Sequence, residues 1–265
     1  MSAALSVSSP RERIVEALRS AARNGQPGLV AFLTAGFPRR DRFSEHLAAI
    51  AAEADVVEIG VPFTDPMADG ATIQHSSEVA LRQGVTLRWI LDTLAAMPPV
   101  RAPLLLMSYL NPLLAFGFEA LATAAVRGGV CGFIVPDLPY DESAELRAAL
   151  DVHGLALVQM VTPVTPPERL ARLCQASAGF IYAVTMTGTT GRSVAVPDEV
   201  LAYLDRVRAL ATVPVCAGFG IRSREQVERL RGHVDGVVVG SALVEVLERG
   251  EAPQPWLASL RPPRR

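Results

Sequence analysis

Short apolar runs recur at regular intervals along the chain, and a segment with helical periodicity follows each run. The runs are nearly continuous in Val, Ile, Leu and Ala, which is typical of parallel strands covered on both faces. The pattern predicts eight strands, at Leu29–Leu33, Val56–Gly60, Leu104–Met107, Gly132–Val135, Ala156–Val161, Phe180–Val184, Val213–Ala217 and Gly236–Val239.

The segments between these runs carry helix signals. Ser223 and Gln226 have the spacing of a capping box, and Gly154 lies where a helix ending near Val152 needs a left-handed residue. An additional helix is predicted before the first strand, from Arg11 to Asn24, where it would close the bottom of a barrel.

Eight strands that alternate with helices favour an α/β fold, a single (β/α)8 TIM barrel over residues 1–265 with an extra N-terminal helix. An open, doubly wound sheet is the alternative, because periodicity does not reveal whether a sheet closes. In a barrel of this kind the chemistry lies on the loops after the carboxyl ends of the strands. Functional residues are therefore expected on those loops.

Composition removes several classes of function. All 25 basic residues are arginines, so the absence of lysine excludes a lysine Schiff base. A net charge of −2 gives no reason to expect nucleic acid or a membrane as a partner. Strand-sized apolar runs and an N-terminus without a signal-like pattern predict a cytoplasmic protein. Reduced structural thiols are expected for the three separated cysteines, Cys131, Cys174 and Cys216.

An acidic residue interrupts the second strand. Alternation along Val56–Gly60 puts Glu58 on the face opposite to Val57 and Ile59, and we expect this side chain to point into the barrel mouth. Burial of an unpaired carboxylate raises its pKa, which suits proton transfer. The alternative is a structural ion pair between Glu58 and an arginine elsewhere in the barrel.

Two further carboxylates, Asp65 and Asp69, follow in the next loop. Asp-Pro and Asp-Gly are common in turns, so each residue alone is more readily explained as a turn residue. Their place just after Glu58 makes them candidates for the same site, and Asp69 is the better one.

Later loops are rich in glycine, in the segments TGTTGRS, AGFGIRS and VVGSALV after the sixth, seventh and eighth predicted strands. Glycine lets backbone N–H groups approach an anion, and a helix beginning at Gly240–Ser241 would direct its positive end towards it. Barrels often bind phosphate where the loops after strands seven and eight meet. We expect a phosphate site there, the alternative being that each glycine serves only a tight turn. The loop at 187–197 is expected to act as a lid.

Metal chemistry has little support. The chain has four histidines, and no pair of them has the spacing of metal ligands. Neither a nucleophile elbow nor a nucleotide-binding motif is present. The expected chemistry is acid–base catalysis by carboxylates on a phosphorylated substrate, without a cofactor or a metal.

The segment VVEIGVPFTDPMADGATIQ resembles the signature of the tryptophan synthase α subunit family. FLTAGFP, VPDLPYDES, TGTTG, AGFGI and VVGSALV match the family in order, so the likeness covers almost the whole chain. It implies a TIM barrel that cleaves indole-3-glycerol phosphate to indole and glyceraldehyde 3-phosphate by a retro-aldol reaction.

The resemblance also implies roles for individual residues. Glu58 would be the acid–base group, Asp69 would accept the indole N–H, and Tyr182 matches an active-site tyrosine, although a core strand aromatic is its plain alternative. The indole pocket would comprise Phe32, Ile73, Leu106, Ile134 and Phe219. Thr190 would be the lid residue that meets Asp69, and the phosphate would lie at Gly191, Gly220, Gly240 and Ser241.

Members of this family pair with a pyridoxal-phosphate β subunit in an α2β2 complex, and the segments around Asp65 and Asn111–Pro112 correspond to that contact surface. The chain departs from the family at Gly191–Ser193 and at Met107–Leu110, where communication with the partner is expected. The sequence leaves three alternatives open: a stand-alone lyase that releases indole for another pathway, a silent phosphate-binding barrel that regulates a partner, and a phosphosugar isomerase.

Overall fold

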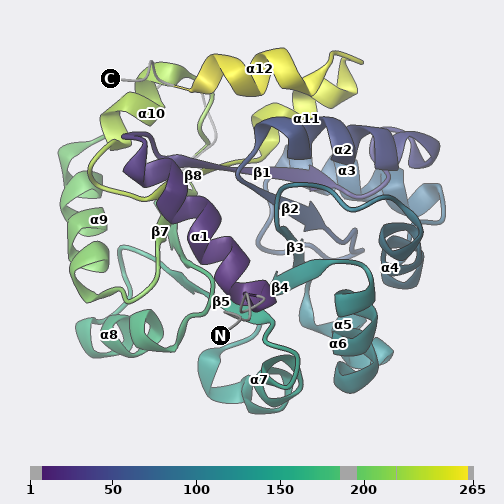
Figure 1. Cartoon of the computed structure of the whole chain (residues 1–265), viewed down its shortest axis with the longest axis horizontal. Helices are drawn as coiled ribbons and strands as arrows, with labels where there is room; N and C mark the ends of the chain where they lie inside the picture. Colours follow the sequence, from purple (N-terminus) through teal and green to yellow (C-terminus); the bar gives the residue numbers. More distant parts are fainter. Residues whose placement is uncertain (1–7, 186–195, 219, 262–265) are drawn as a thin grey trace, which may run out of the picture.

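The computed structural model describes residues 8–185, 196–218 and 220–261, and eight parallel strands in it form a closed barrel in chain order (Figure 1). Closure confirms the TIM barrel and excludes the open sheet. The strands are β1 (Gly28–Thr34), β2 (Val56–Gly60), β3 (Leu104–Met107), β4 (Val130–Ile134), β5 (Ala156–Val161), β6 (Ile181–Val184), β7 (Val215–Gly218) and β8 (Gly236–Val239).

All eight predicted strands are present, with small differences at their ends. The largest are at β4, which begins at Val130 rather than at Gly132, and at β7, which begins at Val215 rather than at Val213. The register between β3 and β4 shifts between Leu104 and Leu105. The sequence pattern missed the start of β4 at Val130, because Gly132 interrupts the apolar run. A Cβ at this position would lie 2.7 Å from the carbonyl oxygen of Ala156 on β5, so only glycine allows the two strands to approach this closely.

Helices form the outer ring of the barrel (Figure 1). They are α2 (Phe43–Glu53), α3 (Ala71–Arg82), α4 (Leu87–Ala96), α5 (Leu110–Phe116), α6 (Phe118–Arg127), α7 (Ala144–Asp151), α8 (Pro167–Ala176), α9 (Asp198–Leu210), α10 (Arg224–Leu230), α11 (Ser241–Glu248) and α12 (Pro253–Leu260), with short 3-10 turns η1 (Arg40–Arg42) and η2 (Tyr140–Glu142). The predicted local signals are confirmed: the N–H of Ser223 donates to Gln226 at 3.2 Å, and Gly154 has a φ of 63°.

The predicted N-terminal helix is present as α1 (Pro10–Arg23), which crosses the barrel in Figure 1. Its Ile14 and Leu18 are fully buried among the inward side chains of the strands. A Cβ on Gly28, the first residue of β1, would lie 2.8 Å from Leu18. The helix therefore closes the amino-terminal end, and burial of each of the two side chains contributes about 2 kcal/mol.

Side chains alternate between two apolar layers. Val57 and Ile59 of β2 pack in the larger layer between strands and helices, whereas Val56 packs inside the barrel. Glu58 belongs to the inward set, as its spacing predicts. With α1 closing the other end, the inward residues near the carboxyl ends of the strands are the ones that can meet a substrate.

Candidate active site

Glu58 lies inside the barrel, and its carboxylate is unpartnered in the part of the chain that the structure describes. On β2 it is flanked by Phe32 of β1 and Leu105 of β3, and it is 0% exposed. Neither carboxylate oxygen has a hydrogen-bond partner within the described residues. Burial, and secondly the negative charge of Asp69, raise the pKa of Glu58 from 4.5 to about 8. At neutral pH the group is therefore mainly protonated and can donate a proton.

Two other carboxylates beside strands show what a structural role looks like in this barrel. Asp55, before β2, accepts the N–H of Leu29 at 2.7 Å and pairs with Arg261 at 3.1 Å. Asp235, before β8, accepts the N–H of Val215 at 2.8 Å. Both groups tie strand ends together at the closed end of the barrel. Glu58 makes no such bond within residues 8–185, 196–218 and 220–261, so that part of the chain offers no support for the ion-pair alternative.

Asp69 lies on the loop between β2 and α3, and the backbone of this loop is well held. Its N–H donates to the Pro66 carbonyl at 3.1 Å, and the Gln74 side chain donates to the Asp69 carbonyl at 2.9 Å. Burial raises the pKa of Asp69 to about 6, and a hydrogen bond from Tyr109 acts in the opposite direction. Asp69 is therefore largely ionised at neutral pH, and its carboxylate can accept an N–H.

Tyr109 is a site residue that the sequence pattern did not single out. It directly precedes α5, and its ring stacks on Phe63 with centroids 5.0 Å apart. Its hydroxyl accepts the N–H of Ala68 at 2.9 Å and donates to Asp69, and burial raises its pKa to about 12. One hydroxyl thus fixes both the backbone and the side chain of the Asp69 loop. Its position just after β3 was the one available signal.

Tyr182 points into the barrel from β6, where it packs against the inner apolar cluster. Burial, and secondly the charge of Glu58, raise its pKa well above 10. A Cβ on Gly218 of β7 would lie 2.4 Å from the tyrosine ring, so glycine makes room for it. Glu58, Asp69 and Tyr182 are therefore near enough to influence one another's ionisation.

A small cavity of about 20 Å³ lies beside Asp69. It is lined by Phe32, Gly60, Val61, Asp69, Ile73, Ser77, Met107, Ser108 and Tyr109. Phe32 and Ile73, expected in the indole pocket, thus lie next to Asp69, while Ile134 packs in the inner apolar cluster.

The structure contradicts the assignment of Leu106 to the indole pocket. Leu106 packs in the outer layer, and Leu105 and Met107 face inward instead. Strand alternation makes the assignment wrong by one position, and Met107 is the β3 residue that lines the cavity.

Three of the four expected phosphate-binding residues, Gly220, Gly240 and Ser241, lie at two neighbouring strand ends. Gly240 and Ser241 join β8 to α11, whose first N–H groups have no acceptor within the helix. Gly220 follows the adjacent strand β7 and has a φ of 45°, a left-handed conformation that favours glycine. The two elements thus follow adjacent strands of the barrel. Three expected site residues lie outside the described residues: Thr190, Gly191 and Phe219.

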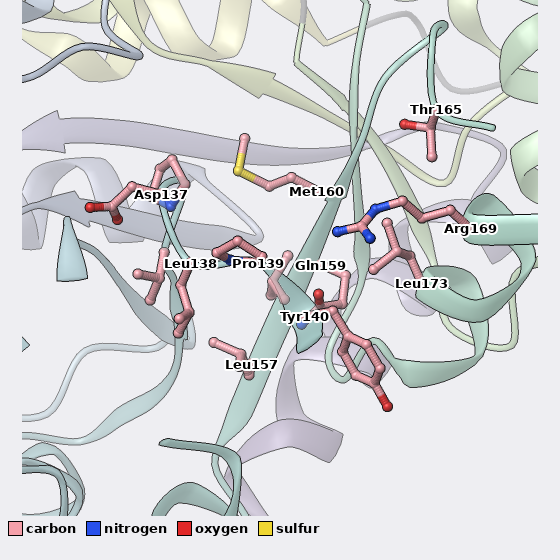
Figure 2. Close-up of a pocket in the computed structure, with 13 residues that line it drawn as sticks. Asp137, Leu138, Pro139, Tyr140, Leu157, Gln159, Met160, Thr165, Arg169 and Leu173 are labelled. Carbon is pink, nitrogen blue, oxygen red and sulfur yellow. The ribbon is translucent and has the colours of Figure 1, made fainter. Parts of the chain in front are cut away.

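A larger cavity of about 390 Å³ lies at the carboxyl ends of β4 and β5 (Figure 2). Leu157, Gln159, Arg169 and Leu173 are among the residues that line it, and the Asp137 carboxylate there accepts the N–H of Leu110 at 2.9 Å. Glu58, Asp69 and Tyr182 are not among the residues that line it. The cavity is therefore separate from the carboxylate site.

Other kinds of site find little support. Over the described ranges, no cluster of three or more His, Cys, Asp or Glu side chains could hold a metal ion. In the same part of the chain, no helix combines the length and apolar character that a membrane span requires.

Comparison with known proteins decides the family, since the sequence model of "Tryptophan synthase alpha chain" matches residues 18–259. The chain belongs to the tryptophan synthase alpha chain family. The relative from Nitratidesulfovibrio vulgaris strain DP4 is 46% identical over 240 residues, covering 90% of this chain and 93% of its own. The relative from Bacillus mycoides is 42% identical over 236 residues, covering 88% and 92%.

Solved structures of the family share the fold. A tryptophan synthase structure from M. tuberculosis superposes with a TM-score of 0.86 at 35% identity, covering 94% of this chain and 96% of that chain. The tryptophan synthase α subunit from Legionella pneumophila gives 0.83 at 31% identity, with coverages of 94% and 96%. The resemblance in the strand-end motifs is thus confirmed at the level of family and fold.

Proposed function

We propose that this tryptophan synthase alpha family member cleaves indole-3-glycerol phosphate with Glu58 as the proton-transferring group. The observation that carries the proposal is the fully buried, unpartnered Glu58 with a pKa of about 8. A carboxylic acid that is still protonated at neutral pH can give its proton to carbon C3 of the indole ring. A solvated glutamate, ionised at this pH, has no proton to give.

The proposed reaction starts with that proton transfer. As C3 of the ring gains the proton, the ring nitrogen develops positive charge, and the Asp69 carboxylate accepts the N–H and stabilises this charge. The ring then serves as the electron sink, which explains how the reaction proceeds in a chain without lysine.

The Glu58 carboxylate left behind next takes the proton of the glycerol hydroxyl beside the bond to be broken. A carbonyl forms there, the carbon–carbon bond breaks, and its electron pair returns to the ring as the nitrogen charge is lost. Indole and glyceraldehyde 3-phosphate leave. Indole keeps on C3 the proton that Glu58 donated, and Glu58 is protonated again because it took the proton of the glycerol hydroxyl. Tyr182, whose pKa the charge of Glu58 raises, would limit access of water and help to orient the substrate.

The substrate would be held at its two ends. Phe32, Ile73 and Met107 would contact the indole, since they share a cavity wall with Asp69. The phosphate would bind the N–H groups near Gly220 and at the start of α11, where the helix dipole favours an anion. Ile134 would complete the apolar wall, and Thr190, Gly191 and Phe219 keep the roles that the family resemblance implies.

A partner subunit is part of the proposal. Met67 and Leu114 are large apolar side chains that are 84% and 52% exposed. They lie next to Asp65 and Pro112 in the sequence segments that resemble the family's contact surface, and the similar M. tuberculosis structures are those of tryptophan synthase. We propose a β subunit as the partner and the cytoplasm as the location, where the three free thiols stay reduced.

The alternatives differ in what they require of Glu58. A silent regulatory barrel has no use for a buried carboxylate that costs several kcal/mol to ionise. A phosphosugar isomerase needs no apolar pocket beside Asp69. A stand-alone lyase would use the same residues, and only activity without a partner separates it from the α subunit.

The test is an indole-release assay on the purified chain, alone and with a tryptophan synthase β subunit. We expect turnover of indole-3-glycerol phosphate by the wild type and a stimulation by the β subunit. Glu58→Gln should reduce kcat at least about 10³-fold while substrate still binds, because only the proton-transferring group changes. Absence of turnover under both conditions would refute the proposal, as would a Glu58→Gln variant that keeps most of the wild-type rate.

A further inference from the structure

An ion pair joins the two elements of the phosphate site. Both Nη atoms of Arg222 donate to the Glu245 carboxylate, each at 2.7 Å. Arg222 lies two residues after Gly220 in the loop that follows β7, and Glu245 lies one turn along α11 from Ser241. The pair therefore bridges the two backbone segments that would bind one phosphate.

Each end of this bridge is anchored. The backbone N–H of Arg222 donates to Gln226 of α10 at 2.8 Å, which fixes the loop on its own side. On the other side, Glu248 near the end of α11 lies 3.2 Å from His75 of α3. Arg222 and Glu245 thus connect two held segments and are not a pair of free surface side chains.

The two charges stay paired over a wide pH range. The hydrogen bond from Arg222 holds the pKa of Glu245 below its usual range, and the same bond raises the pKa of Arg222. The side chains are 45% and 30% exposed, so water weakens the pair but does not replace it. The parallel two-bond geometry fixes direction as well as distance, which a lysine at position 222 would not do.

We propose that Arg222 and Glu245 are positioning residues that hold the Gly220 loop against the start of α11, so that both present their N–H groups to one phosphate. This inference rests on the proposed function only in taking those groups as the phosphate site. Arg222 has a second effect. Without it, the uncompensated negative charge of Glu245 would lie near the phosphate and oppose its binding.

Three variants separate these effects. Arg222→Gln removes the bridge and leaves the Glu245 charge unpaired. The double variant Arg222→Gln/Glu245→Gln removes the bridge and leaves the site's net charge unchanged. Arg222→Lys keeps the positive charge and loses the two-bond geometry. Glu251→Gln is the matched control, since Glu251 forms a similar pair with Arg249 just beyond the far end of α11, at 2.6 and 3.1 Å.

The measurements are kcat and KM for indole-3-glycerol phosphate and, independently of turnover, the Kd for inorganic phosphate by calorimetry. We expect both KM and Kd to rise about threefold in the neutral double variant and about tenfold in Arg222→Gln, values in keeping with a partly exposed ion pair. Arg222→Lys should fall between the wild type and Arg222→Gln. In all three variants kcat should stay near the wild-type value, and Glu251→Gln should change neither constant.

The results distinguish the two proposals. If the neutral double variant binds phosphate as tightly as the wild type, the bridge does not position the site and the inference is wrong. A fall in kcat at unchanged KM and Kd would also overturn it. If the variants weaken phosphate binding as expected but the wild type turns over no indole-3-glycerol phosphate, the positioning role of Arg222 and Glu245 is supported and the proposed function is refuted.

Discussion

Glu58→Gln should make the protein more stable at the same time as it abolishes turnover. The wild-type carboxyl is fully buried and has no hydrogen-bond partner among the described residues, so its ionisation is unfavourable in the folded state only. Glutamine has nearly the same shape and no charge. The substitution thus removes the unfavourable ionisation and leaves the packing inside the barrel almost unchanged.

The size of the effect follows from the pKa of Glu58, which is about 8 in the folded chain against an ordinary value of 4.5. Below the lower value the carboxyl is protonated in both states, and it contributes no difference. Between the two values the unfolded chain loses the proton and the folded chain keeps it, so stability falls as the pH rises. The loss reaches about 3 kcal/mol near pH 7 and levels off at about 5 kcal/mol above pH 8.

Urea denaturation of the wild type and of Glu58→Gln at several pH values measures this loss. The difference between the two free energies of unfolding should be near zero at about pH 4 and should grow to about 3 kcal/mol in favour of the variant near pH 7. Glu142→Gln, at an exposed glutamate of η2, is the control and should track the wild type. Parallel curves for the wild type and Glu58→Gln would refute the account of a raised pKa.

Three further predictions concern the walls of the site. Tyr109→Phe removes the hydrogen bond that lowers the pKa of Asp69. The acid limb of the pH profile of kcat/KM, expected near pH 6, should therefore move to higher pH, and an unchanged limb would show that Tyr109 does not influence the reacting carboxylate. Met107→Ala should raise KM, because Met107 lines the cavity beside Asp69. Leu106→Ala should lower the free energy of unfolding by about 2–5 kcal/mol with little effect on KM, because Leu106 packs in the outer layer. The reverse result would show that Leu106 contacts the indole. Gly220→Val should raise KM and Kd for phosphate with kcat nearly unchanged, because a branched residue strains the left-handed backbone at φ 45°; unchanged constants would leave Gly220 a simple turn residue.

Period-two alternation explains why the position of Glu58 was predictable. A single charged residue in an apolar strand marks one face, and the structure places that face inside the barrel. Alternation does not show which way Leu106 points, because the run Leu104–Met107 is apolar on both faces and carries no polar residue that marks one of them. The family resemblance then assigned the indole pocket to Leu106, one residue away from the inward-facing Leu105 and Met107.

Contacts between distant segments were not predictable from the pattern. Tyr109 and Asp69 lie on the loops of two different strands, and their bond depends on how β2 and β3 are aligned. Arg222 and Glu245 lie 23 residues apart, on either side of β8, and each looks like an ordinary surface charge in the sequence. Local signals such as the Ser223–Gln226 capping box depend only on neighbouring residues, and these were predicted correctly.

The most direct measurement is the pKa of the Glu58 carboxyl itself, obtained by NMR titration of the protein labelled with ¹³C at glutamate side-chain carboxyls. The resonance that disappears in Glu58→Gln identifies the group. We expect this signal to titrate near pH 8, far above the ordinary value of 4.5. A titration near the ordinary value would mean that the group is ionised at neutral pH and cannot supply the proton that the reaction requires.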